Sequence, residues 1–238
     1  GVTQRLEQIK ISSANIDALL LTHLHSDHVV DLYQLIISSW HSYRCKPWKI
    51  YGPKGTKEFV QSLMQAWKVE RGQRIKYERR SSTKAFNIKV QEFKKHGKIK
   101  IKDLVFEYFE VDHKPVKHAY GFNFHNKRKK ITISGDTRPC NNLMEYAQKT
   151  DLLLHEVFIE GELKPSNRMV SNKTLHNVKN YHTSSEDVGK IAKISQAKKL
   201  VLTHFVPPEF NERKLMNTVK KDFGKKPIIG KDLLKITV

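Results

Sequence analysis

A histidine-rich segment is the part of the sequence best suited to chemistry. Residues 22–28 read Thr-His-Leu-His-Ser-Asp-His and directly follow an apolar run. Because side chains alternate along a strand, we expect His23 and His25 on one side of its exit, with a turn bringing Asp27 and His28 round to them. Three imidazoles and a carboxylate suit zinc or a similar borderline metal, whereas magnesium and calcium prefer oxygen ligands alone. A polar surface cluster is the alternative.

Five later segments carry further histidines and acidic residues. They are Val111-Asp112-His113-Lys114-Pro115, Gly135-Asp136-Thr137-Arg138-Pro139-Cys140, Leu154-His155-Glu156-Val157, Tyr181-His182-Thr183-Ser184 and Leu202-Thr203-His204-Phe205. The second follows a predicted strand and the last ends another. Loops at strand ends are common places for binding residues.

Taken together and in this order, these segments resemble the metallo-β-lactamase superfamily, in its ribonuclease Z and arylsulfatase-type branch. The resemblance implies an α/β fold, the αββα four-layer sandwich with two mixed sheets, formed by a single domain over residues 1–238. Family members usually carry further strands before the position of Gly1. We therefore expect the first sheet to be incomplete at the N-terminus and to expose an edge.

The resemblance also implies two metal ions, two Zn²⁺ with Mn²⁺ or Fe²⁺ as alternatives. In the expected ligand set one metal binds His23, His25 and His113, the other binds Asp27, His28 and His204, and Asp136 bridges the two. Two metals about 3.5–4 Å apart lower the pKa of a bridging water and clamp the attacking and leaving oxygens. Asp27 would also orient the bridging hydroxide.

Two more residues are expected to complete the catalytic set with Asp27. By the same resemblance, His182 donates a proton to the leaving oxygen and Glu156 orients His182. A displaced alkoxide is a poor leaving group near pH 7, so a positioned imidazole is worth about 10²–10⁴-fold in rate. The alternative is that His182 caps a helix beginning near Ser184 or Ser185.

Apolar periodicity predicts strands mixed with strand–helix units. Helical spacing is found over residues 2–9, 29–36 and 59–67, and strands are predicted over residues 16–21, 49–51, 104–111, 151–154, 200–203 and 233–238. Residues 120–124 and 130–134 would form a hairpin around residues 126–129. Residues 68–102 carry 13 Lys and Arg against three Glu, with strand-like alternation, which is typical of a solvated sheet edge or loop.

Composition limits the classes of protein. The 238 residues include 44 Lys and Arg against 24 Asp and Glu, a formal net charge of +20, which attracts polyanions or anionic substrates and also aids solubility. No apolar run approaches the ~18 residues that span a bilayer, so a membrane-spanning protein is excluded. Cys45 and Cys140 are too few for a disulfide framework or a four-cysteine zinc site. Without a targeting signal near Gly1 we expect a cytoplasmic protein, or a periplasmic or secreted one if a signal was removed.

These features lead to the hypothesis of a dinuclear-zinc hydrolase of anionic esters, either phosphodiesters or aryl sulfates. The alternative is ribonuclease Z, which processes the 3′ end of precursor tRNA. Only residues 123–134 separate Tyr120-Gly121-Phe122 from Gly135-Asp136, so the long tRNA-gripping arm of typical ribonuclease Z is absent, and the basic residues 68–102 would replace it. A basic nucleic-acid-binding protein with a vestigial site is a third possibility. The expected partners are a small anionic ester or tRNA, no membrane and, as is common in this family, a second copy in a homodimer.

Overall fold

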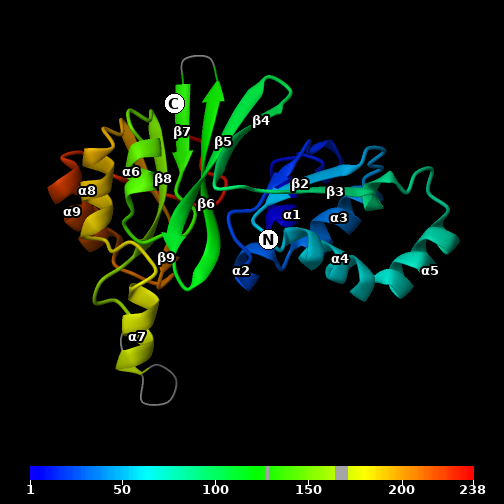
Figure 1. Cartoon of the computed structure of the whole chain (residues 1–238), viewed down its shortest axis with the longest axis horizontal. Helices are drawn as coiled ribbons and strands as arrows, with labels where there is room; N and C mark the ends of the chain where they lie inside the picture. The colour runs from blue at the N-terminus through cyan, green and yellow to red at the C-terminus, as the bar shows by residue number, and fades with distance from the viewer. Residues whose placement is uncertain (127–128, 164–170) are drawn as a thin grey trace. The chain divides into compact units, whose positions relative to one another are not determined.

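The computed structural model describes residues 1–126, 129–163 and 171–238. These residues form two compact units, Gly1–Lys94 and Lys95–Val238. Each unit contains one β-sheet with helices packed against it (Figure 1). The α/β class with two sheets is therefore confirmed.

The first unit is built on a parallel sheet with the strand order β1-β2-β3. Side chains alternate along β2, with Trp48 and Ile50 buried and Lys49 exposed. The buried side pairs with the apolar face of α3, where Leu35 and Ile36 lie. The elements in chain order are α1 (Val2–Gln8), η1 (Ser13–Asn15), β1 (Leu19–Leu20), α2 (Ser26–Val29), α3 (Leu32–His41), β2 (Trp48–Gly52), α4 (Thr56–Ala66), α5 (Lys68–Glu78), η2 (Lys84–Phe86) and β3 (Ile88–Glu92).

A buried arginine fixes the segment that leads into β1. Arg44 is 1% exposed, and its Nη1 donates to the carbonyl oxygens of Ala14 at 3.0 Å and Ile16 at 2.7 Å, while Nη2 donates to that of Pro47 at 2.9 Å. The guanidinium carbon lies 3.9 Å from the centre of the Trp48 ring. A buried charge is tolerated only when it is hydrogen-bonded. Arg44 therefore couples the approach to β1 to the core of the unit.

The second unit contains a seven-stranded mixed sheet with the order β10-β9-β8-β7-β6-β5-β4. Strands β4 to β7 are antiparallel neighbours, whereas β7 to β10 pair in parallel. The elements are β4 (His96–Ile101), β5 (Leu104–His113), β6 (Val116–Asn126), β7 (Lys129–Ile133), α6 (Asn141–Tyr146), β8 (Leu152–Phe158), α7 (Asn172–Lys179), α8 (Asp187–Ile194), β9 (Lys199–Val206), α9 (Glu212–Phe223) and β10 (Ile228–Ile229).

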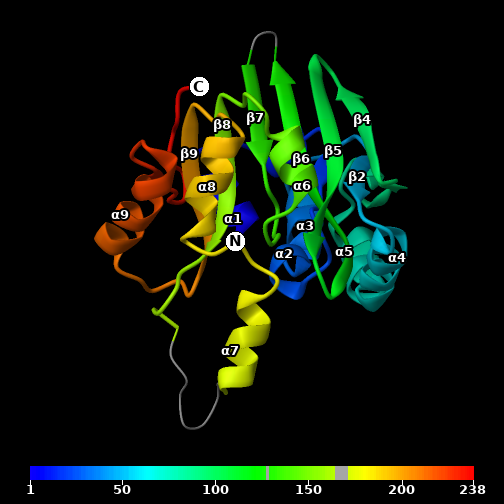
Figure 2. The ribbon, with the colours of Figure 1, turned by 60° about the vertical axis from the view of Figure 1, so that its left-hand side comes forward.

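Three helices of the second unit enclose its core. Leu143 of α6, Ile191 of α8 and Val219 of α9 belong to one buried apolar cluster with Leu153 of β8 and Leu200 of β9. Figure 2 shows α8 and α9 side by side next to β8 and β9. None of the helices in the described part of the chain is long and apolar enough to cross a membrane.

Most of the predicted elements are present. The helices predicted over residues 2–9, 29–36 and 59–67 correspond to α1, α3 and α4, and five of the six predicted strands correspond to β1, β2, β5, β8 and β9. The predicted hairpin is confirmed by the pairing of β6 with β7, from Phe122 opposite Ile133 to Asn126 opposite Lys129. Residues 127–128 of its turn lie outside the described residues.

Two predictions were wrong. Residues 68–78 form the helix α5, in which Arg74 pairs with Glu70 and Glu78 at helical spacing, and such pairs stabilise a helix. The strand-like alternation applies only to β3 and β4. Residues 233–238 form no strand in the described structure, because Leu233 adopts a left-handed φ of 64° in a turn where Leu234 N donates to the Lys231 carbonyl.

The contact between α8 and α9 gives a testable stability difference between two helical glycines. A Cβ at Gly189 would lie 2.6 Å from the Val219 carbonyl oxygen, whereas one at Gly72 of α5 would meet nothing within 4 Å. We expect Gly189→Ala to lower the free energy of unfolding by about 1–3 kcal/mol through overpacking. Gly72→Ala should raise it by about 0.5–1 kcal/mol through helix propensity. Denaturant unfolding of both variants checks this, and equal midpoints would contradict it.

Candidate metal centre

Four candidate ligands of the first unit come from one loop and from the short helix α2 that follows it in the chain. Leu21 N donates to the Tyr51 carbonyl at 2.8 Å and extends the pairing of β1, after which the chain leaves the sheet. The helix α2 then turns the chain back. In this turn the ring centres of His23 and His25 lie 4.7 Å apart, and those of His23 and His28 lie 4.1 Å apart.

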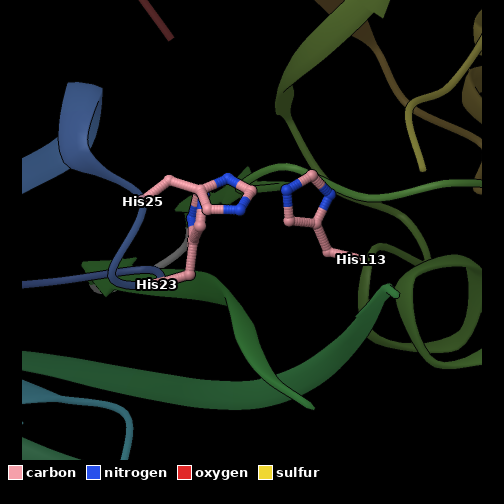
Figure 3. Close-up of side chains that lie close together, drawn as sticks. All are labelled: His23, His25 and His113. Atoms are coloured by element: carbon pink, nitrogen blue, oxygen red, sulfur yellow. The ribbon is translucent and has the colours of Figure 1, made fainter. Parts of the chain in front are cut away.

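The carboxyl group of this segment lies with the imidazoles. Asp27 Oδ2 is 3.3 Å from His28 Nε2, and His28 N donates to the His25 carbonyl at 3.0 Å. Figure 3 shows His23 and His25 projecting from this loop, and it also labels His113 of the second unit. Within the segment, His23 therefore lies close to His25 and His28, and Asp27 lies close to His28.

The second unit brings three more predicted site residues together. One donor atom from each of Asp136, His182 and His204 lies within 4.8 Å of the others. The Nε2 atom of His204 is 3.3 Å from Asp136 Oδ2, and the ring centres of His182 and His204 are 5.6 Å apart. His113 lies next to this cluster, with its ring centre 5.3 Å from that of His182.

A backbone carbonyl sets the orientation of His113. The Nδ1 atom lies 2.8 Å from the Tyr181 carbonyl oxygen, and since a carbonyl only accepts, Nδ1 carries the proton. The lone pair is then on Nε2, which is the nitrogen available to bind a metal. Hydrogen bonds of this kind fix the tautomer and the ring direction of metal-binding histidines.

Irregular backbone positions two of the histidines. Along β8 and β9, Glu156 is opposite Thr203 but Val157 is opposite Phe205, so His204 is an additional residue in β9. It adopts a left-handed φ of 46°. This conformation is unfavourable for residues other than glycine and is found often at functional sites. A second register shift precedes His113 in β5. Both irregularities re-aim a histidine at the end of a strand.

The carboxyl group of Glu156 connects two of the ligand-bearing loops. It is 1% exposed, and its Oε1 accepts hydrogen bonds from Thr183 N at 2.9 Å and Thr137 N at 3.3 Å. The same oxygen lies 3.2 Å from His182 Nδ1. Thr183 Oγ1 also donates to the Thr137 carbonyl at 2.7 Å. Glu156 therefore holds the loop that carries Asp136 against the segment that carries His182.

Burial sets the protonation of this network. Desolvation raises the pKa of Glu156 well above its usual range, and the charge of Asp136 acts in the same direction, while the amide donors of Thr183 and Thr137 oppose both. Burial likewise lowers the pKa of His155 to about 4. Neutral His155 donates from Nδ1 to the Glu156 carbonyl at 2.7 Å. His155 is thus a core residue that supports Glu156.

Some supporting contacts were not identified from sequence. Thr137 and Thr183 lie within the segments that carry Asp136 and His182, but nothing in the sequence indicates that their amide groups share the Glu156 oxygen. An ion pair at 2.9 Å between Arg138 and Asp112 also joins the loop after β7 to the end of β5. The only sequence feature that could have indicated these residues is that each lies within two positions of a candidate site residue.

The donor chemistry of both groups fits a transition metal. The first unit supplies His23, His25, Asp27 and His28, and the second supplies His113, Asp136 and His204. Imidazole nitrogen with carboxylate oxygen is a donor set typical of Zn²⁺, Mn²⁺ or Fe²⁺. In the second unit His204 Nε2 and Asp136 Oδ2 lie 3.3 Å apart, close enough to bind one ion together.

The chain is similar to known proteins in sequence and in fold. The ribonuclease Z of Mycolicibacterium gilvum is 32% identical over 249 residues, which cover 100% of this chain and 83% of the relative. The metallo-β-lactamase fold protein YhfI of Bacillus subtilis has a TM-score of 0.71 at 19% identity, over 97% of this chain and 81% of that chain. The short form of human tRNase Z has a TM-score of 0.67 at 21% identity, over 100% of this chain and 85% of that chain.

The fold and the His and Asp donors define a metal-dependent hydrolase of the metallo-β-lactamase superfamily, in its ribonuclease Z branch. A family model described as Anti-Pycsar protein Apyc1 matches residues 1–208, and the chain belongs to this family. The resemblance inferred from the motifs is therefore confirmed.

The hydroxyl of Thr183 offers a test of how the two loops are held together. Thr183→Val removes the donor to the buried Thr137 carbonyl, and leaving such a group without a partner costs about 1–3 kcal/mol. We expect this variant to unfold at lower denaturant concentration and to retain less zinc after dialysis, because the Asp136 loop loosens. Thr183→Ser keeps the hydroxyl and is the matched control. A Val variant with the wild-type midpoint and zinc content would contradict the assignment.

Proposed function

We propose that this protein is a metal-dependent phosphodiesterase that cleaves RNA in the manner of ribonuclease Z, at the 3′ end of precursor tRNA. The buried pair of His182 and Glu156 beside Asp136 and His204 carries the proposal. Hydrolysis of a phosphodiester needs metal ligands and a proton donor in one place. The relatives named Ribonuclease Z, at 28% and 32% identity over the whole chain, support RNA as the substrate.

We further propose a dinuclear centre on the ligand pattern of the superfamily. One ion would be held by His23, His25 and His113, the other by Asp27, His28 and His204, and both by Asp136. When bound, such ions lower the pKa of water and stabilise negative charge on a phosphoryl group. Asp27 is expected to orient the attacking oxygen through its carboxylate.

Glu156 is proposed to direct proton transfer by His182. Since His182 Nδ1 lies 3.2 Å from the Glu156 carboxyl, a proton on Nδ1 would face that carboxyl, and Nε2 is the atom that would serve the leaving oxygen. A positioned imidazole of this kind contributes about 10²–10⁴-fold to the rate. The burial of both side chains, His182 at 7% and Glu156 at 1% exposed, limits competition from water.

A smaller anionic ester is a second candidate substrate. Strands β6 and β7 pair continuously from Phe122–Ile133 to Asn126–Lys129, so a long tRNA-gripping arm is not inserted between Gly121 and Gly135. A site without that arm also suits a small phosphodiester or an aryl sulfate. The expectation of a homodimer stays a prediction.

Side-by-side assays separate these substrates. We expect the zinc-loaded protein to hydrolyse bis(p-nitrophenyl) phosphate at least about tenfold faster than p-nitrophenyl sulfate, because two metals suit an in-line displacement at phosphorus. It should also cut a precursor tRNA at the 3′ side of the acceptor stem. Faster sulfate hydrolysis would make the arylsulfatase-like function primary. Cleavage of the small phosphodiester without cleavage of precursor tRNA would favour the second candidate.

Variants separate metal binding from proton transfer. Asp136→Ala should abolish turnover and reduce bound zinc, whereas His182→Ala should retain zinc and lower kcat by about 10²–10⁴-fold. His96 is exposed on β4, so His96→Ala is the control and should match the wild type. Metal analysis and steady-state kinetics measure both effects. Full activity with full zinc content in Asp136→Ala would overturn the proposal.

A further inference from the structure

The helix α5 presents an unusual distribution of charge. It spans Lys68–Glu78, and none of its residues is buried. Isolated helices of this length are marginal in water, so side-chain pairs must contribute to its stability. Arg74 supplies them, pairing with both Glu70 and Glu78 one turn away on either side.

The acidic residues of α5 are turned inward and already paired. Glu70 is 35% exposed and accepts a hydrogen bond from Tyr33 Oη at 3.3 Å, in addition to its ion pair with Arg74. Glu78 is 23% exposed and lies 2.7 Å from Arg80 Nε. Hydrogen bonds from Arg80 and Arg74 also lower its pKa. Neither carboxylate is left to neutralise cations on the outer face of the helix.

The unpaired charged residues on the outer face of α5 are all cations. Lys68, Lys76 and the C-cap residue Arg79 are exposed, and their side chains make no hydrogen bond or ion pair with the residues that the structure describes. Their spacing places them within an arc of about 80° over a length of about 16 Å. Gly72 lies between them, and a Cβ there would meet nothing within 4 Å, so the backbone is open to close approach.

The chemistry of this face favours a polyanion with regularly spaced charges. We propose that Lys68, Lys76 and Arg79, here called the α5 cation stripe, bind the phosphate backbone of the RNA substrate. This inference rests on the proposed function, since it supplies that RNA-cleaving site with a separate binding surface. Tyr77 directly follows Lys76 and is 90% exposed. It adds a flat ring on which an unpaired base can stack.

A membrane surface fits α5 less well. Helices that lie on membranes place a continuous face of Trp, Phe and Leu beneath their cations. The exposed apolar residues of α5 are Val69 and Tyr77, which lie on the same side of the stripe, two turns apart, with the polar residue Gln73 between them. Two apolar side chains separated by a polar one do not form such a continuous face.

The test compares two triple variants with the same change in net charge. Lys68→Gln/Lys76→Gln/Arg79→Gln removes the stripe, and Lys193→Gln/Lys220→Gln/Lys221→Gln removes three exposed cations of α8 and α9. Binding of mature tRNA to the metal-loaded protein is followed by fluorescence anisotropy between about 50 and 200 mM KCl. We expect the stripe variant to raise Kd about tenfold or more and to reduce the slope of log Kd against log [KCl] by about 2–3, one unit per lost phosphate contact. The control variant should stay within about threefold of the wild type.

Two further measurements separate the stripe from the active site. Hydrolysis of bis(p-nitrophenyl) phosphate should be unchanged in the stripe variant, and circular dichroism should match the wild type. If the wild type hydrolyses no phosphodiester but the stripe variant still binds tRNA more weakly than the wild type, the proposed function is wrong while the RNA-binding surface is confirmed. Equal losses of tRNA affinity in both triple variants would overturn the proposed role of the stripe. So would a stripe variant that binds tRNA as the wild type does but binds vesicles containing 30% phosphatidylglycerol more weakly.

Discussion

The buried carboxyl group of Glu156 is the contact on which the second unit's site depends. One of its oxygens receives the amide groups of Thr137 and Thr183 and lies against the ring of His182. Its other oxygen, Oε2, is buried and makes no hydrogen bond with any residue that the structure describes. Burying such a group costs free energy that the surrounding structure must offset, and β8 is an interior strand of the sheet, paired with β7 on one side and β9 on the other. A strand that is hydrogen-bonded on both sides therefore carries the group that aligns the loops.

The types and order of the candidate ligands could be predicted from sequence, because they stand in short segments with distinctive composition. Residues 22–28 carry four donors in seven positions, and the structure gathers them through a strand, a loop and the short helix α2. What could not be predicted is how the later histidines are aimed. His204 occupies an additional position in β9 with a φ of 46°, and such register shifts depend on the pairing of two whole strands rather than on local sequence.

The errors in the predicted elements have the same origin. Alternation of polar and apolar residues over positions 68–102 suggested strands, yet the Glu70–Arg74–Glu78 pairs stabilise a helix over the first third of that stretch. Nothing in the sequence indicated a structural role for Asn123. In the structure Asn123 is buried, donates to Glu107 and the Tyr146 carbonyl, and accepts from Thr132. It therefore joins β5, β6 and β7 to the end of α6, a role that only the assembled sheet reveals.

The proposed pair of metal ions, held by imidazole and carboxylate side chains of this chain, can be observed by X-ray absorption at the zinc edge of the zinc-loaded protein. We expect nitrogen and oxygen ligands at about 2.0–2.2 Å, no sulfur, and a second metal at about 3.5–4 Å. The metal content should be close to two per chain. A single zinc without a metal neighbour, or a sulfur ligand from Cys45 or Cys140, would contradict the account.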